Sequence, residues 1–215
     1  MIILGLTGSI AMGKSTAAAM FRRLGIPVYD ADREVHRLLA RNGRAVPLID
    51  RAFPGVVVDG AVDRGRLGAR VFDDRSALRR LERILHPLVR ARRRTFLQSA
   101  ARQRRPLVVL DIPLLFETDG GRMCDAVAVV SAPRFLQEIR LLRRPGMDRA
   151  RLAAIARRQM PDAEKRRRAD FIIPSGLGRG PTFAAIRRIV LALRGQGRGK
   201  WSRSHISMYL DCKQT

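Results

Sequence analysis

The segment GSIAMGKST at residues 8–16 constrains this chain more than any other feature. It fits the pattern GxxxxGK[ST], in which a glycine-bounded loop joins a strand to a helix. The apolar run Ile2–Leu6 precedes the loop, and the Ala-rich segment Ser15–Leu24 follows it with helical spacing and Gly25 at its end. The segment therefore predicts a strand–loop–helix unit whose loop can hold phosphate.

The residue types in this loop fit that chemistry. Gly8 and Gly13 allow backbone torsions that turn successive N–H groups inward, and the helix N-terminus adds its positive end. Lys14 supplies a positive charge to the β- and γ-phosphates, Ser15 can ligate Mg²⁺, and Thr16 can support the α-phosphate. The competing interpretation is an ordinary glycine turn before a helix. The order of strand, loop and helix favours nucleotide binding, which we assign to Gly8, Ala11, Met12, Gly13, Lys14, Ser15 and Thr16.

Further short apolar runs alternate with helical segments along the chain. They lie at residues 26–29, 107–110, 126–130 and 171–173. Such alternation predicts an α/β fold of the P-loop NTPase type, with a parallel sheet covered on both faces and active groups at the carboxyl ends of the strands. Residues 42–68 are expected to form a looped insertion. Two helices, 76–85 and 88–104, are expected on either side of His86-Pro87.

Composition constrains the cellular compartment and the relation to membranes. No apolar run approaches the roughly 20 residues that a membrane-spanning helix needs, and Met1 leads directly into the first strand, so we expect an unprocessed soluble protein. The two cysteines, Cys124 and Cys212, show no metal or disulfide pattern, which fits a reducing compartment.

The formal net charge of +24 favours polyanionic ligands. Nucleic acid is therefore an alternative partner. The basic residues are scattered and accompanied by few aromatic residues, whereas single-strand binders combine basic grooves with stacking rings. Small polyphosphate substrates would benefit from the same positive field.

Carboxylates at strand ends are candidates for catalysis. Asp30 and Asp32 follow the second strand, where one could accept the proton of an attacking hydroxyl and the other could hold a metal or the acceptor. We choose Asp32 as the base, although either residue could instead cap the next helix. Asp111 ends the third apolar run, where P-loop proteins often hold Mg²⁺ through water, but a structural role is equally open.

Basic residues in the second half could contact the transferring phosphoryl group. Arg140, Arg143 and Arg144 lie near the break Pro145-Gly146, in a segment that we interpret as a helical hairpin. A closing lid would bring a guanidinium onto the phosphates and exclude water, although a solvated helix face is an equal alternative. His86 lacks a second histidine nearby and is treated as a secondary substrate-binding residue.

Five segments in order resemble dephospho-CoA kinases. They are LTGSIAMGKST, YDAD, the HP dipeptide at His86, DIPLLFE at 111–117 and RRQMPDAEKRRRADFII at 157–173, and the similarity spans about residues 2–193. The resemblance implies phosphoryl transfer from ATP, with Mg²⁺, to the 3′-hydroxyl of the ribose of dephospho-CoA, the last step of coenzyme A biosynthesis. It also implies a cytoplasmic protein. From the residues themselves we expect no membrane association, and no obligate protein partner is evident.

The same resemblance implies three parts and a set of site residues. The core would comprise residues 1–30, 106–132 and 161–194, the helical acceptor domain 31–105 and the lid 133–160. Residues 195–215, which open with GQGRGK and show no clear periodicity, are expected to form a flexible tail outside the resemblance. Lys14, Asp32 and Arg140 would be catalytic, and Ser15 would handle the metal. The acceptor side would comprise Asp32, His86, Pro113, Leu114, Leu115 and Glu117.

The sequence also departs from the family pattern. Ser9 and Ala11 stand where many members have glycine, and Pro174-Ser175 replaces a more usual polar pair. Two alternative functions stay open. The first is another small-molecule P-loop kinase, which the segments PLLFE and HP disfavour. The second is a nucleic-acid-binding P-loop ATPase.

Overall fold

The computed structural model describes residues 1–72, 74–118, 120–143 and 159–195. They separate into two compact units. The first unit contains Met1–Tyr29 and the described residues from Ala100 onward, and the second contains Asp30–Ser99. Residues 144–158 of the expected lid and 196–215 of the expected tail lie outside the described residues.

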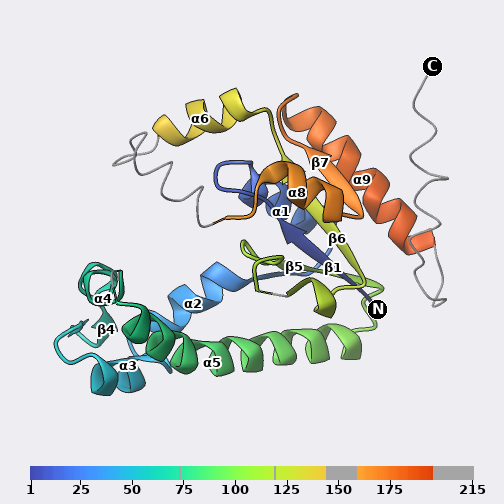
Figure 1. The fold of residues 1–215 in the computed structure, drawn as a ribbon. Coiled ribbons are helices and arrows are strands. Elements are labelled where there is room, and N and C mark those ends of the chain that lie inside the picture. Colours follow the sequence, from blue (N-terminus) through green and yellow to red (C-terminus); the bar gives the residue numbers. More distant parts are fainter. Residues whose placement is uncertain (73, 119, 144–158, 196–215) are drawn as a thin grey trace. The chain divides into compact units, whose positions relative to one another are not determined.

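The first unit is built on a five-stranded sheet with the order β2-β5-β1-β6-β7 (Figure 1). Its strands are β1 (Ile2–Thr7), β2 (Val28–Asp30), β5 (Leu107–Asp111), β6 (Ala126–Ser131) and β7 (Phe171–Pro174). β1 is central and pairs in parallel with β5 and β6, and β6 pairs in parallel with β7. The predicted α/β fold with a parallel sheet is confirmed.

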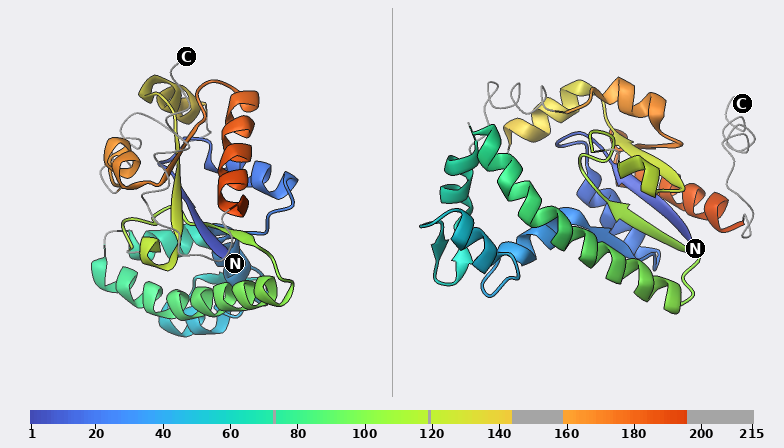
Figure 2. Two further views of the ribbon diagram at one scale, coloured as in Figure 1. Left: turned by 90° about the vertical axis from the view of Figure 1, so that its right-hand side faces the viewer. Right: turned by 60° about the horizontal axis from the view of Figure 1, so that its bottom comes forward.

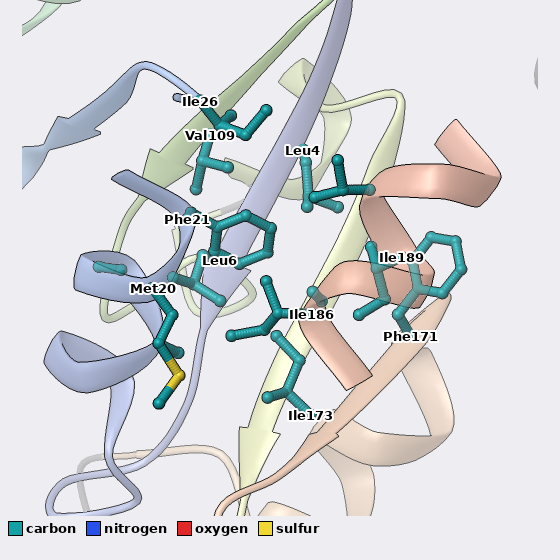
Figure 3. Close-up of a cluster of buried hydrophobic side chains, with 14 of the residues drawn as sticks. Leu4, Leu6, Met20, Phe21, Ile26, Val109, Phe171, Ile173, Ile186 and Ile189 are labelled. Carbon is teal, nitrogen blue, oxygen red and sulfur yellow. The ribbon is translucent and has the colours of Figure 1, made fainter. Parts of the chain in front are cut away.

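Two helices, α1 (Lys14–Arg23) and α9 (Arg179–Gly195), cover one face of this sheet. Their apolar side chains form one buried cluster with side chains of β1, β5, β6 and β7. Figure 3 shows Phe21 of α1 and Ile186 of α9 beside Leu6 of β1. Burial of this apolar face stabilises the strand–loop–helix unit and thereby fixes where the phosphate loop begins and ends.

The opposite face is also covered. Along β6, Ala126, Ala128 and Val130 belong to the cluster under α1 and α9, whereas Val127 and Val129 pack with Leu115 on the other side. The short helix α8 (Asp162–Arg168) lies on that second side, so α8 and α9 flank the sheet (Figure 2, left). Coverage of both faces explains why β6 is apolar at nearly every position. The remaining elements are η1 (Gly120–Met123) and α6 (Arg134–Leu142).

The second unit consists of helices around a separate apolar core. Its elements are α2 (Ala31–Leu39), α3 (Val46–Ala52), the antiparallel pair β3 (Val57–Val58) and β4 (Ala61–Val62), α4 (Arg64–Val71) and α5 (Arg75–Arg102), which continues into the first unit. Among the buried side chains, Leu38, Ile49 and Leu67 bring α2, α3 and α4 to one core.

The prediction of a looped insertion at residues 42–68 is wrong. Pro47 stands in the first turn of α3, where a missing N–H leaves no helical hydrogen bond unmade. Asp63 caps α4 by accepting hydrogen bonds from the N–H groups of Gly65 and Arg66 at 2.8 and 3.0 Å. Proline and glycine therefore mark helix starts here rather than a continuous loop.

The predicted helix break at His86-Pro87 is also wrong, because α5 continues through Pro87. Proline lacks an N–H and disfavours a helix interior by about 3 kcal/mol. Leu81, Leu85 and Leu88 pack on the core of the second unit, so the helix carries one apolar stripe past the proline. Tertiary burial on both sides of Pro87 offsets its local cost.

Candidate active site

The phosphate loop has the shape that its glycines predict. A side chain at Gly8 would place its Cβ 2.7 Å from the carbonyl oxygen of Val130, so the loop leaves β1 too close to β6 for any larger residue. Gly13, immediately before α1, has φ +89°, in the left-handed region. Ala11 also has a positive φ of 60°, which costs an alanine roughly 1–2 kcal/mol.

Lys14 lies at the start of α1 and is paired with Asp111. Its Nζ is 2.6 Å from Asp111 Oδ1, and the two side chains are 16% and 3% exposed. Asp111 ends β5 and is aligned with Leu6 of β1, one residue before β1 ends. The parallel register therefore brings this carboxylate to the mouth of the phosphate loop. The hydroxyl-bearing residues Ser15 and Thr16 are exposed in the same first turn of α1.

Arg140 on α6 reaches the phosphate loop. Its Nη2 donates to the Ser175 carbonyl at 2.7 Å, and its Nη1 donates to Ser175 Oγ at 3.2 Å and to the Ala11 carbonyl at 3.4 Å. Ser175 Oγ in turn donates to the Met12 carbonyl at 2.5 Å. One planar guanidinium thus bridges the phosphate loop and the end of β7. Arg143 is exposed beyond α6, and Arg144 lies outside the described residues.

The segment PLLFE folds against β1. Thr7 Oγ1 donates to the Pro113 carbonyl at 2.8 Å, Leu115 is fully buried, and Leu114 is exposed. Glu117 accepts the N–H of Met160 on Oε1 at 2.9 Å, and the same oxygen lies 2.9 Å from Lys165 Nζ. Burial raises the pKa of Glu117, but the contact with Lys165 and the N–H of Met160 outweigh it and lower the pKa below its usual value.

Asp30 and Asp32 belong to the second unit and have different surroundings. Asp30 is the N-cap of α2 and accepts the N–H of Arg33 at 3.0 Å. Asp32 lies in the first turn of α2 and lines a pocket of about 410 Å³ together with His36 and Arg64. The rest of that lining is mainly apolar and includes Val35, Leu39, Leu67, Val71, Leu81 and Leu85.

His86 lines a different, smaller pocket on α5. This pocket has a volume of about 290 Å³ and is lined by Arg79, Glu82, Arg83 and His86. The structure therefore assigns Asp32 and His86 to separate pockets of one unit. Among the described residues, no group of three or more His, Cys, Asp or Glu side chains could hold a metal ion by itself.

The sequence analysis did not predict several residues that contact or support the phosphate loop. Gln137 and Gln159 hydrogen-bond the backbone of Ile10, Ser175 links Met12 to Arg140, and Lys165 is buried against Glu117. Lys165 stands in a run of basic residues that reads as a solvated helix face. Neither the burial of Lys165 nor the position of Gln137 has a signal in the sequence, whereas Gln159 could have been singled out through the family segment that contains it.

A parallel sheet with central β1, a glycine-bounded loop leading into α1, a lysine at the start of that helix and an arginine of α6 that reaches the loop define a P-loop nucleotide-binding protein. Similarity to known proteins identifies the family within this class. The family model for dephospho-CoA kinase matches residues 2–177, and the chain belongs to this family.

Relatives agree with this assignment. The chain is 65% identical to the dephospho-CoA kinase of Paramagnetospirillum magneticum over 91% of this chain and 92% of the relative. It is 55% identical to that of Mesorhizobium japonicum over 91% and 98%. The crystal structure of TT1252 from Thermus thermophilus superposes with a TM-score of 0.77 at 38% identity, covering 89% of this chain and 96% of that one. As a member of this family the chain is an ATP-using kinase.

Proposed function

We propose that this kinase transfers the γ-phosphoryl group of ATP to the 3′-hydroxyl of the ribose of dephospho-CoA, giving coenzyme A and ADP. The observation that carries the proposal is the phosphate loop between β1 and α1, which Lys14 follows and Arg140 of α6 contacts, in a chain that matches the family model over residues 2–177. The acceptor is inferred from the family, and the donor side from the loop.

On the donor side, we assign the triphosphate to the backbone N–H groups of Gly8, Ala11, Met12 and Gly13 and to the side chains of Lys14 and Thr16. Lys14 would exchange part of its interaction with Asp111 for the phosphates, because a dianionic phosphate competes well for an ammonium group. Arg140 already lies within hydrogen-bonding distance of the Ala11 carbonyl, so its guanidinium needs little movement to meet charge that develops on the transferring group.

Mg²⁺ is the metal that we propose for this site, held by the hydroxyl of Ser15. The donor set fits, because Mg²⁺ prefers oxygen ligands and is commonly held by one or two protein groups, with phosphate oxygens and water completing the shell. The exposed hydroxyl of Ser15 stands next to Lys14, whereas a cage of carboxylates is absent from the described residues. When bound, the ion neutralises phosphate charge; Asp111 stays a candidate for indirect contact through water.

On the acceptor side, we assign Asp32 as the general base for the ribose hydroxyl. Its pocket combines a carboxylate and Arg64 with an apolar wall, which suits a ligand that carries both phosphate and an aliphatic arm. His86, Pro113, Leu114, Leu115 and Glu117 complete the proposed acceptor side. Leu115 is buried and would act by shaping the loop, not by touching the ligand.

The domain assignment is part of the same proposal. Residues 1–30, 106–132 and 161–194 would bind ATP, residues 31–105 would bind the acceptor, and residues 133–160 would form the lid. We also place the reaction in the cytoplasm, where both substrates would be small molecules and no protein partner would be needed. No helix among the described residues is long and apolar enough to cross a bilayer.

The test is a coupled ADP-release assay with Mg-ATP and different acceptors. Turnover with dephospho-CoA, and not with adenosine, AMP, shikimate or a short oligonucleotide, is expected. If only another alcohol stimulates ADP release, that alcohol and not dephospho-CoA is the acceptor. Stimulation by the oligonucleotide that collapses between 50 and 200 mM salt would instead indicate a nucleic-acid-dependent ATPase, because polyanion binding through many phosphates is steeply salt-dependent.

A further inference from the structure

Lys165 is an unusual residue in this chain, because it is a lysine on a short helix and yet is fully buried, with 0% exposure. The basic residues that follow it on α8, Arg166, Arg167 and Arg168, are exposed. Lysine is almost never fully buried unless it is paired. The cost of desolvating its ammonium group must therefore be offset by a specific interaction.

That interaction is with Glu117. Lys165 Nζ forms an ion pair with Glu117 Oε1 at a distance of 2.9 Å. The same Oε1 accepts the backbone N–H of Met160 at 2.9 Å. The lysine thereby keeps beside Met160 a carboxylate that burial alone would favour in its neutral form.

Met160 is adjacent to a residue that contacts the phosphate loop. Oε1 of Gln159 accepts the N–H of Ile10 at 3.1 Å, and Nε2 of Gln137 on α6 donates to the carbonyl of Ile10 at 2.9 Å. Both polar backbone groups of Ile10 are thus fixed by glutamines. Ile10 stands between Ser9 and Ala11, directly before the positive φ of Ala11, so its orientation sets the path of the loop.

We propose that Lys165 is a positioning residue for nucleotide binding. It holds Glu117, Glu117 anchors Met160, and the anchored segment keeps Gln159 on Ile10, so that the phosphate loop is ordered before ATP arrives. Lys165 acts on the loop from the far side of the sheet through this chain of contacts and itself touches no substrate. This inference rests on the proposed role of the phosphate loop in binding ATP.

The chain of contacts predicts non-additive losses. We expect Gln159→Ala, Glu117→Gln and Lys165→Met each to raise KM for ATP by about threefold to tenfold, the range that one hydrogen bond to a preorganised group supports, with kcat within about twofold. If Lys165 acts through Gln159, combining Gln159→Ala with either other substitution adds no more than about twofold to the loss from Gln159→Ala alone.

The experiment measures KM for ATP and kcat by ADP release, together with Kd for ATP by calorimetry and Tm for every variant. Arg166→Met, on the same helix but exposed, is the matched control and should leave all four values unchanged. Losses that multiply in the double variants, or an unchanged KM in Gln159→Ala, overturn the proposal. If Lys165→Met does not fold, the comparison of Glu117→Gln, Gln159→Ala and their combination decides.

Lys14→Ala separates this proposal from the function on which it rests. Unchanged Kd for ATP in Lys14→Ala would remove the phosphate loop from ATP binding. Weakened binding in Lys14→Ala together with multiplied losses in the double variants would overturn only the positioning role of Lys165.

Discussion

Lys14 Nζ lies 2.6 Å from Asp111 Oδ1 at the mouth of the phosphate loop, and Asp111 is 2% exposed. The lysine that should receive the phosphates is therefore oriented by a carboxylate from the neighbouring strand. The pair fixes the ammonium group at the loop before any ligand is bound.

Asp111→Asn should lower both stability and nucleotide affinity, because the largely buried ammonium of Lys14 loses its counter-charge. A hydrogen bond to a charged group is worth about 1.5–3 kcal/mol, which corresponds to a fall in Tm of about 3–12 °C in a chain of this size. We expect KM for ATP to rise about tenfold. Glu138→Gln is the control, since it breaks an exposed ion pair with Arg134 that contributes little. Equal melting temperatures for the two variants would contradict a structural role for the buried pair.

Asp32→Asn should lower turnover by about 10²-fold or more while ATP binding is retained, because a positioned general base is typically worth 10²- to 10⁴-fold. Asp30→Asn, two residues earlier, is the matched control. Asparagine caps helices as well as aspartate does, so α2 and turnover should be preserved in that variant. Steady-state ADP release measures turnover, and calorimetry measures the affinity for ATP. A near-wild-type rate in Asp32→Asn would remove it from the role of base.

Arg140→Ala should lower kcat at least tenfold, because the variant loses a guanidinium with three hydrogen bonds at the phosphate loop and the end of β7. Arg140→Lys keeps the charge but cannot make the same forked contacts, so it should recover only part of the loss. Full recovery by lysine in the ADP-release assay would show that charge alone matters at this position.

Glu117 should make stability depend on pH in mild acid. Its pKa in the folded protein is lowered from the ordinary value of 4.5, so the unfolded chain binds the proton more readily. The stabilisation is therefore complete above pH 4.5 and is lost as the pH falls through the lower folded pKa. Thermal melts between pH 3 and 6 should show a shallower acid decline for Glu117→Gln than for the wild type. The lowered pKa values of Asp63 and Asp74, which come first from backbone hydrogen bonds, act equally in both proteins and cancel. Parallel melting curves would disprove the contribution of Glu117.

Pro87→Ala should stabilise the protein, because α5 passes through this position and proline there supplies no N–H to the helix. A gain of about 1–3 kcal/mol in the free energy of unfolding is expected from helix propensity. Pro87 is exposed, so little packing is lost. Urea denaturation of both proteins measures the difference. A less stable variant would mean that the proline contributes a bend on which the core of the second unit depends.

The sequence by itself determined the elements whose signal is local. Residues 8–16 predicted the loop between β1 and α1 because glycine torsions and the lysine are needed within a few residues of one another. The apolar runs predicted strands covered on both faces, and β6 shows this by burying alternate residues in two clusters. Family segments then predicted the kinase and its acceptor.

Only the tertiary structure decided features that depend on residues distant in sequence. Pro87 looked like a helix break but lies inside α5, because burial of neighbouring leucines and valines outweighs local propensity. Pro47 belonged to the expected loop but begins α3, where its missing N–H costs no helical hydrogen bond. The pairing of Lys14 with Asp111 follows from strand register, and the burial of Lys165 follows from α8 packing over the sheet beside Glu117. A sequence pattern indicates only how readily a residue type is buried. Which charged side chains form ion pairs depends on how the strands and helices are arranged in space.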